Sequence, residues 1–551
     1  MNKRAAVDIE TDDLNATVIH CIAAQDLDTN QVFAFHGDTI KKFPEWSERY
    51  DIFIMHNGVS FDAPTLNRLT GSNIKLKQVR DTLILSQLVD PAMEDGHSLD
   101  AWGKRLGFPK TDYSDFTHFN QQMLEYCVND VKLTVKLYNH LMPMIQKYST
   151  KSIELEHTIR AIVDQQERNG FTLNVPEASC LMARLSEEAA DIESEMQSIF
   201  PPIITERYSE KTGNRLKDHV EIFNPASRQQ IAKRLIAKGW KPTSFTPTGH
   251  PIVDEGTLNG VDIPEAQKIS QYLLLQKRVS QIKSWINVVA DDNKVHGRVM
   301  TLKAISGRMA HHSPNMAQIP AVYSPYGKEC RAVWTTTDSR YSLLGCDASS
   351  LELRCLAHYM GDKRFTEEVV NGDTHTANQK AAGLPTRDAA KTFIYALIYG
   401  AGPFKIGSIV GGGAKEGKDI MSKFMSNMPA LKSLRDKIDR AAQTGYIRGL
   451  DGRLLKVRQQ HAAANLLLQG AGAIICKEWL RQITILARRQ GFDYSLVASI
   501  HDEYQFEVRK DQAQSFGEMT QKAMKLVEKE LNVLCPLDSE FKIGNNWAET
   551  H

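Results

Sequence analysis

The sequence predicts a multidomain α/β protein, and three observations support that fold class. The chain has 551 residues, of which 42% are hydrophobic and 24% charged, and this is the composition of a folded protein. At roughly 100 to 200 residues per domain, such a length predicts about three or four domains. Short β-rich runs alternate with helical stretches in residues 1–148 and again after Gly307, whereas the chain between them is mainly helical.

The individual elements follow from hydrophobic periodicity and from turn residues. Runs rich in Val, Ile, Phe and Tyr that are bounded by polar residues predict β-strands. We expect these strands at residues 18–24, 32–35, 51–55, 341–346, 496–500 and 504–508. In the middle stretch we expect long polar helices at 180–198 and 267–289, with a capped helix starting near Asn224-Pro225. This middle stretch has few positions suited to catalysis, so we interpret it as an arm.

Composition excludes several classes of protein. No run of 18 apolar residues exists, and the N-terminal residues pass from basic to acidic without an apolar segment. We therefore expect no membrane span and no secretion, and hence a cytoplasmic protein. Eight cysteines without a Cys-x-x-Cys pair indicate reduced thiols rather than a zinc site. The net charge of +1 does not exclude a nucleic-acid partner, because a neutral total can combine a basic groove with acidic metal sites.

Four carboxylates and a tyrosine in the first 130 residues form the first candidate site. Asp8 and Glu10 are two residues apart on an apolar strand, so both project from the same face. Asp62 follows the next apolar strand, and Tyr126 and Asp130 are four apart on one face of a helix. Neighbouring acids resist ionisation unless a cation compensates them. Such oxygen ligands hold pairs of Mg²⁺ or Mn²⁺ ions about 3.5–4 Å apart for phosphodiester hydrolysis, and a tyrosine hydroxyl can orient the water.

Each of these motifs alone also fits chance acids on loops and helix faces. In this order and spacing, however, they resemble the Exo I, Exo II and Exo III motifs of DEDD-type 3′→5′ exonucleases, in the subclass that carries a tyrosine. The resemblance implies an RNase H-like exonuclease domain. It also implies that Asp8, Glu10, Asp62 and Asp130 bind the metal ions and that Tyr126 is catalytic.

A second set of acids lies at strand ends in the last two fifths of the chain. An apolar strand leads into Asp347 and then into a helix that carries Glu352 in its first turns. Apolar residues precede and alternate after His501-Asp502-Glu503, and this pattern predicts a hairpin with these three residues at its turn. Asp347 and Asp502 therefore offer two carboxylates to a second two-metal site. The His-Asp-Glu triplet alone also fits a solvated turn.

Between these acids, one helix combines two cations with two aromatic rings. Arg387, Lys391, Tyr395 and Tyr399 recur every four positions and form one stripe. The stripe suits a ligand with phosphates at one end and a flat base at the other, and His375 adds a phosphate donor. For the two cations alone, an amphipathic surface helix is the simpler interpretation. The position between the two acid motifs favours a nucleotide site.

These motifs together carry a second resemblance. The patterns DxSxxELR at 347–354, RxxxKxxxYxxxYG at 387–400 and HDE at 501–503, behind an exonuclease domain, resemble motifs A, B and C of family A DNA polymerases. The match extends through residues 306–309, 314–320, 324–327, 465–473 and 546–551. At this level of detail the chain is similar to the replicative polymerase of T-seven-like short-tailed bacteriophages.

The resemblance implies a right-hand polymerase after the exonuclease domain, with proofreading during phage DNA replication. It would act in the host cytoplasm. The expected limits are 1–148 for the exonuclease domain, 149–300 for the thumb, 301–362 and 446–551 for the two parts of the palm, and 363–445 for the fingers.

The resemblance also assigns roles to individual residues. It makes Asp347 and Asp502 ligands of two metal ions, Mg²⁺ or alternatively Mn²⁺, and Glu503 an auxiliary catalytic acid. Glu352 corresponds to the side chain that crowds the sugar 2′ position. The residues assigned to the triphosphate, sugar and base are Arg387, Lys391, His375, Tyr395 and Tyr399. Lys391 is also assigned as proton donor to the departing pyrophosphate. The residues assigned to DNA near the primer end are Arg308, Asn465, Gln469 and His501.

Partners follow from the same resemblance. It implies primer-template DNA and dNTPs, and it leaves a helicase/primase and a single-strand-binding protein open; we expect a monomer. T-seven-like enzymes carry a long basic thumb insertion that captures host thioredoxin, whereas a short connection, about Pro201–Val220, stands in that place here. We therefore expect no thioredoxin dependence. Between Leu431 and Gln460 eight cations outnumber three aspartates, which we interpret as a template-facing patch, with a solvated helix face as the alternative.

Three other classes of protein share parts of this pattern. A nuclease whose C-terminal region only grips DNA, or a non-catalytic primer-end binding factor, would have lost one or both acid sets, and both sets are intact. A single-subunit RNA polymerase has a related palm, but Glu352 and the exonuclease domain argue against ribonucleotide synthesis.

Overall fold

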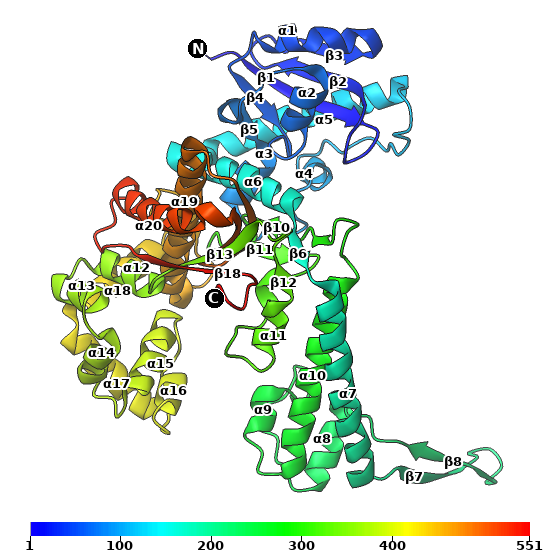
Figure 1. The fold of residues 1–551 in the computed structure, drawn as a ribbon, viewed down its shortest axis with the longest axis vertical. Helices are drawn as coiled ribbons and strands as arrows, with labels where there is room; N and C mark the ends of the chain where they lie inside the picture. The colour runs from blue at the N-terminus through cyan, green and yellow to red at the C-terminus, as the bar shows by residue number, and fades with distance from the viewer. Residues whose placement is uncertain (1) are drawn as a thin grey trace.

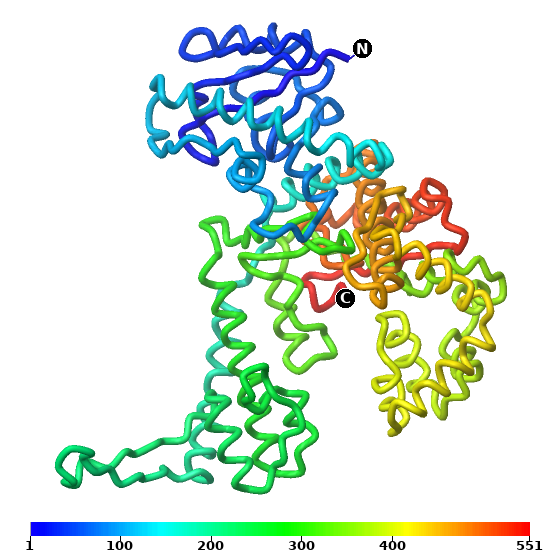
Figure 2. The backbone as a smooth tube through the Cα atoms, turned by 180° about the vertical axis from the view of Figure 1, so that it is seen from behind, coloured from blue at the N-terminus to red at the C-terminus, as the bar shows by residue number. Residues whose placement is uncertain are grey.

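A computed structural model describes residues 2–551 of the chain as an elongated molecule with four parts. An N-terminal α/β unit lies at one end and a central unit surrounds a four-stranded sheet (Figure 1). A helical arm (residues 175–286) and a helical lobe (residues 363–442) extend from the central unit, and they lie apart from each other in both views (Figures 1 and 2). None of the helices over residues 2–551 is long and apolar enough to cross a membrane.

The N-terminal unit is a five-stranded sheet in the order β3-β2-β1-β4-β5, with helices on its faces. Its strands are β1 (Arg4–Thr11), β2 (Ile19–Asp26), β3 (Val32–His36), β4 (Ile52–Met55) and β5 (Val79–Asp81). Its helices are α1 (Phe43–Ser47), α2 (Asp62–Thr70), α3 (Thr82–Val89), α4 (Leu99–Arg105) and α5 (Gln121–Ile145). Val7 and Ile9 pack into the core on one face, whereas Ala6 packs with Cys127 of α5 on the other. Side chains alternate between the two faces of a strand, so Asp8 and Glu10 lie on the same face as Ala6 and face α5.

The central unit is built on an antiparallel sheet in the order β16-β17-β13-β18. Its strands are β13 (Tyr341–Ala348), β16 (Tyr494–Ile500), β17 (Glu503–Arg509) and β18 (Ser539–Gly544). Its helices are α6 (Thr150–Asn169), α11 (Gly327–Ala332), α12 (Leu351–Met360), α19 (Ala463–Gln490) and α20 (Ala513–Glu530). Smaller strands complete it: β6 (Phe171–Leu173), β9 (Lys294–Val295), β10 (Arg298–Met300), β11 (Ala310–His312), β12 (Trp334–Thr335), β14 (Tyr446–Arg448) and β15 (Leu454–Lys456). The three long strands expected here from the sequence are confirmed, each extended by one or two residues at one or both ends.

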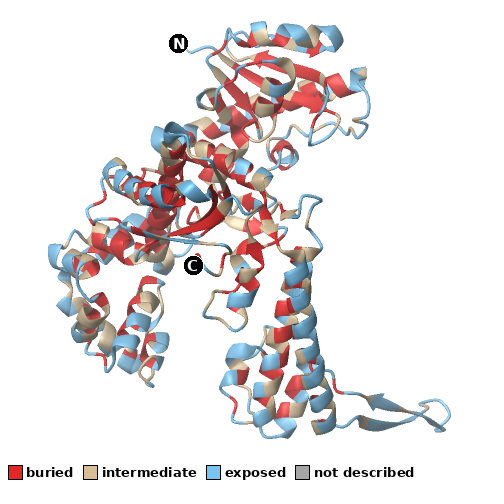
Figure 3. Ribbon diagram, viewed as in Figure 1, coloured by how far each residue is buried: buried red, intermediate tan, exposed pale blue. Residues whose placement is uncertain are grey.

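The helical arm contains the long helices expected from the sequence and one element that was not expected. Its helices are α7 (Val175–Ile199), α8 (Arg228–Ala237), α9 (Glu255–Asn259) and α10 (Pro264–Ile286). The helix expected near Asn224 begins at Arg228 instead, because the Ser227 side chain accepts the Gln230 amide and caps it there. The connection Pro201–Val220 is not a bare linker. It forms the hairpin of β7 (Ile203–Tyr208) and β8 (Arg215–Glu221), which projects from the arm with most of its residues exposed (Figure 3).

The helical lobe consists of six helices: α13 (Lys363–Val370), α14 (Thr374–Ala382), α15 (Arg387–Ile398), α16 (Pro403–Ser408), α17 (Ala414–Asn427) and α18 (Pro429–Ala442). Its buried side chains, among them Phe393 and Phe424, belong to the same hydrophobic cluster as α12 and α19 of the central unit. The lobe is therefore joined to the central unit by a continuous apolar core. This core orients one face of α15 toward the acids at the strand ends.

Candidate active sites

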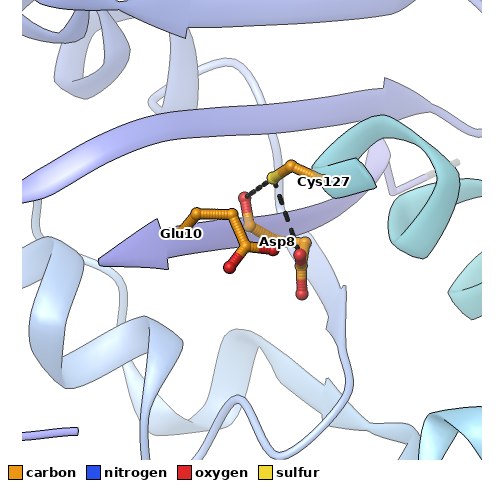
Figure 4. Close-up of side chains that lie close together, drawn as sticks. All are labelled: Asp8, Glu10 and Cys127. Carbon is orange, nitrogen blue, oxygen red and sulfur yellow. Dashed lines mark hydrogen bonds between the residues drawn. The ribbon is translucent and has the colours of Figure 1, made fainter. Parts of the chain in front are cut away.

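The first site lies where β1 passes α5. The ligating atoms of Asp8, Glu10 and Cys127 all lie within 4.8 Å of one another (Figure 4). The Cys127 thiol lies 3.4 Å from the main-chain oxygen of Asp8 and 3.6 Å from its Oδ2, so it donates to that residue. The side chains of Asp62, at the start of α2, and Asp130, on α5, are almost fully buried beside this group. The thiol was not expected from the sequence.

The electrostatics show that the four predicted carboxylates crowd together. Burial, and then repulsion from Asp8 and Asp130, raises the pKa of Glu10 to about 10. Burial and then Asp130 raise the pKa of Asp8 to about 7. Burial and then Asp8 raise the pKa of Asp62 well above its usual value, and burial also raises that of Asp130. Buried acids that repel one another in this way fit divalent cations, whose charge removes the repulsion and whose preferred ligands are oxygens.

Lys110 supplies a cation that sequence reasoning missed. It lies in the loop between α4 and α5 and forms an ion pair with Asp130. Its ammonium group also lies 4.6 Å from the centre of the Tyr126 ring, close enough for a cation–π interaction. Lys110 thus joins the tyrosine and the acid predicted to lie four residues apart on one helix. A lysine in an irregular loop shows no periodicity, so no sequence pattern marked it.

The second site lies at the ends of β13 and β17. Residues 501 and 502 form the two-residue turn between β16 and β17, and His501 has φ 57°, as tight hairpin turns require. The Ala348 amide donates to the Asp502 carbonyl at 3.1 Å and fixes the turn against the end of β13. Partial desolvation, and then repulsion from Asp502 and Glu503, raises the pKa of Asp347 to about 7. These acids, too, form a repulsive oxygen cluster that fits divalent cations.

Glu352 connects this site to the helical lobe. It lies on α12, and its Oε1 accepts from the Tyr399 hydroxyl at 3.3 Å. The same oxygen is 3.3 Å from the Arg308 guanidinium. Glu352, predicted to crowd the sugar, therefore contacts Arg308, predicted to bind DNA, and Tyr399, predicted to flank the sugar and base. Their closeness was not derivable from sequence spacing, since Arg308 and Tyr399 are 91 positions apart.

The predicted phosphate-binding residues lie along α15 and at the start of α14. Arg387 is exposed and forms an ion pair with Asp373 at 2.8 Å, while Lys391, one turn further, is exposed without an ion pair among residues 2–551. The His375 and Tyr395 rings lie 6.3 Å apart, centroid to centroid. The predicted stripe thus exists, with its cations toward the start of α15 and its tyrosines toward the acids.

The predicted DNA contacts come from three segments of the central unit. Asn465 and Gln469 are one turn apart on α19, and the buried Asn465 Oδ1 atom has no hydrogen-bond partner among residues 2–551. Arg308 and His501 line a small crevice together with Asp502, and Gly472 and Ala473 of α19 also line it.

The structure alters two expectations. Glu503 is not part of the turn: it is the first residue of β17, it is 6% exposed, and protein groups engage both of its carboxylate oxygens.

The basic patch predicted between Leu431 and Gln460 is also smaller than expected. Arg453 is buried in an ion cluster, Lys456 pairs with Asp90 at 2.6 Å, and Arg458 donates to the Ala92 carbonyl. The last two hold the N-terminal unit against the central unit. The exposed cations that remain on α18 are Lys432, Arg435, Lys437 and Arg440.

Comparison with known proteins identifies the families to which two parts of the chain belong. Residues 204–549 match the family described as DNA polymerase family A, and residues 2–146 match the 3′-5′ exonuclease family. The chain belongs to family A of the DNA polymerases. It is a DNA-directed DNA polymerase with a 3′→5′ exonuclease domain, and it matches phage replicative polymerases.

The relatives of this polymerase span its whole length. It is 32% identical to the DNA-directed DNA polymerases of Enterobacteria phage T3 and of Escherichia phage T7, over 99% of this chain and 99% of each relative. Those alignments extend over 701 positions against 551 residues here, so both relatives contain additional segments. Its fold is similar to the polymerase domain of Pol1 from M. smegmatis in complex with DNA primer-template and dNTP. The TM-score is 0.82 at 18% identity, covering 100% of this chain and 96% of that one. The predicted family, fold class and enzyme activity are confirmed.

Proposed function

We propose that the two acid clusters are the editing site and the synthesis site of this polymerase. The observation that carries the proposal is their separation: Asp8 and Glu10 lie on a sheet of the N-terminal unit, whereas Asp347 and Asp502 lie at strand ends of another sheet. Each cluster raises the pKa of at least one carboxyl to about 7 or above, as expected for groups that require a cation to ionise together. Polymerases and exonucleases of these families use divalent metal ions.

At the synthesis site, Asp347 and Asp502 would hold Mg²⁺, or alternatively Mn²⁺, two ions in all. When bound, these ions activate the attacking oxygen and stabilise the leaving group. The chain itself positions the nucleotide. Arg387, Lys391 and His375 bind the triphosphate, and the exposed ammonium of Lys391 can protonate the departing pyrophosphate.

Glu352 crowds the 2′ position of the incoming sugar. Its contacts with Arg308 and Tyr399 hold the carboxylate in place beside Tyr395, and this arrangement favours deoxynucleotides. We assign Asn465, Gln469 and Arg308 to the minor-groove acceptors of the primer end, where donors would test pair geometry without reading sequence. His501, at the turn beside Asp502, contacts the primer strand.

At the editing site, Asp8, Glu10, Asp62 and Asp130 hold the metal ions and Tyr126 orients the attacking water. The helical arm corresponds to the thumb, the four-stranded sheet to the palm and the helical lobe to the fingers. The limits expected from the sequence, 149–300, 301–362, 363–445 and 446–551, stay predictions. The first range is wider than the arm, because α6 (Thr150–Asn169) packs on α19 and β16 of the central unit. The partners are primer-template DNA and dNTPs inside the host cytoplasm, with the chain acting as a monomer.

The test separates the two activities in one protein. Asp502→Ala should abolish primer extension and leave hydrolysis of single-stranded DNA unchanged, whereas Asp8→Ala combined with Glu10→Ala should do the reverse. The matched control is Asp511→Ala, an exposed acid just after β17, which should change neither activity. Primer extension that survives Asp502→Ala at the wild-type rate would refute the assignment of the synthesis site.

A further inference from the structure

The carboxylate of Glu503 is enclosed by the last residues of the chain. The indole Nε1 of Trp547 donates to Glu503 Oε1 at 2.5 Å, and the Gln505 amide donates to the same oxygen at 2.7 Å. The other oxygen lies 2.9 Å from His551 Nδ1 and 3.5 Å from the Arg331 guanidinium. Arg331 is also buried, and its guanidinium lies 4.4 Å from the centre of the Trp547 ring. Both oxygens of Glu503 are therefore engaged by protein groups.

The segment Trp547–His551 is itself held against the central sheet. The Thr550 hydroxyl donates to the side-chain Oε1 of Gln505 at 2.8 Å, and Lys542 of β18 donates to the main-chain oxygen of His551 at 2.9 Å. The fit leaves no space at Gly345 of β13, where an added Cβ would lie 2.2 Å from the Thr550 main-chain oxygen. Glycine at this position thus permits the close approach of the segment, two residues before Asp347.

This arrangement connects the segment to both predicted metal ligands. Glu503 is the cross-strand partner of Asp347, and it directly follows Asp502. Fixing the Glu503 side chain therefore fixes the backbone on which both aspartates sit. Groups that orient metal ligands in this way commonly contribute 10- to 100-fold to metal affinity or activity.

We infer that Glu503 is a positioning residue rather than a metal ligand, and that His551 and Trp547 hold it, so that segment 547–551 is part of the synthesis site. The inference rests on the proposed function, in which Asp347 and Asp502 bind the metal ions. If Glu503 turned toward the metal ions, Arg331 would remain buried without its partner, and leaving a buried charge unpaired is strongly unfavourable.

Variants that remove single contacts test the inference. Trp547→Phe keeps the ring but removes the donor, and His551→Ala removes the imidazole. Each should lower kcat for single-nucleotide incorporation about 10- to 100-fold while KM for the dNTP changes less than about twofold. His551→Asn places an amide donor where Nδ1 lies and should recover most of the loss. Hydrolysis of single-stranded DNA by the same proteins should stay at the wild-type rate, which shows that each variant is folded.

A second readout does not depend on activity. Mn²⁺ binding to the complex with primer-template DNA, measured by electron paramagnetic resonance, should keep its stoichiometry in Glu503→Ala and lose it in Asp502→Ala. Loss of Mn²⁺ in Glu503→Ala to the extent seen for Asp502→Ala would overturn the inference, as would a wild-type kcat in both Trp547→Phe and His551→Ala. Failure of the proposed function can be told apart from failure of this inference, because Asp502→Ala would then retain both Mn²⁺ binding and synthesis.

Discussion

A buried cluster of four charges beneath the synthesis site offers a quantitative test of how the chain holds its parts together. Glu156 of α6 contacts Arg453 at 2.6 Å and Lys477 of α19 at 2.7 Å, and Arg453 also pairs with Asp451 at 2.7 Å. These side chains are at most 2% exposed. Two positive and two negative charges balance, and Lys477 additionally donates to the Thr301 carbonyl at 2.8 Å.

Glu156→Gln keeps the shape of the side chain but leaves one positive charge buried without a partner. Arg453 retains Asp451, whereas Lys477 retains only neutral acceptors. Removing one partner of a buried ion pair costs about 3–5 kcal/mol. The free energy of unfolding should therefore fall by that amount in urea titrations followed by circular dichroism. Because the cluster joins α6 to α19, the same variant should also weaken primer extension at 37 °C.

The decisive variant combines Glu156→Gln with Lys477→Met, which restores charge balance. This double variant should recover most of the lost stability, because replacing both partners removes the unpaired charge. The matched control is Glu154→Gln, an exposed position on the same helix, which should stay within about 0.5 kcal/mol of wild type. A loss below about 1 kcal/mol for the single variant, or additive losses in the double variant, would refute the reasoning.

Three further predictions concern each activity and the partner. In this family a tyrosine at the position of Tyr395 accompanies acceptance of dideoxynucleotides, so ddNTPs should terminate synthesis readily and Tyr395→Phe should restore discrimination; equal termination of both proteins in a sequencing ladder would contradict this. Lys110→Ala should lower exonuclease kcat about 10- to 100-fold without changing primer extension, because it releases Asp130 and Tyr126, and the exposed Lys104→Ala is the control. Thioredoxin should not lengthen products in single-hit primer extension with a DNA trap, because the β7–β8 connection has only about 20 residues, the low end of the 20 to 30 that a partner surface of roughly 800 Å² contains. A several-fold increase in product length would show that thioredoxin docks.

The sequence alone determined the features that depend on local periodicity. A spacing of two residues placed Asp8 and Glu10 on one face of β1. A spacing of four placed Arg387, Lys391 and Tyr395 of α15 in one stripe with Tyr399, which directly follows the helix. Apolar runs located the strand that carries Asp347 next to its last residue and the strand that begins after Asp502. These relations follow from the geometry of a strand or helix and need no knowledge of distant residues.

Only the tertiary structure decided the features that depend on long-range contacts. Lys456 was interpreted as a template contact, yet it pairs with Asp90, 366 positions away, because the two units dock through that face. Glu503 was expected at the turn, yet it is the first residue of β17, and its carboxylate contacts Trp547 and His551. A charged side chain has the same local signature whether it faces solvent, DNA or a buried partner. Which of these it meets depends on how separate elements pack, and no spacing within one element records that packing.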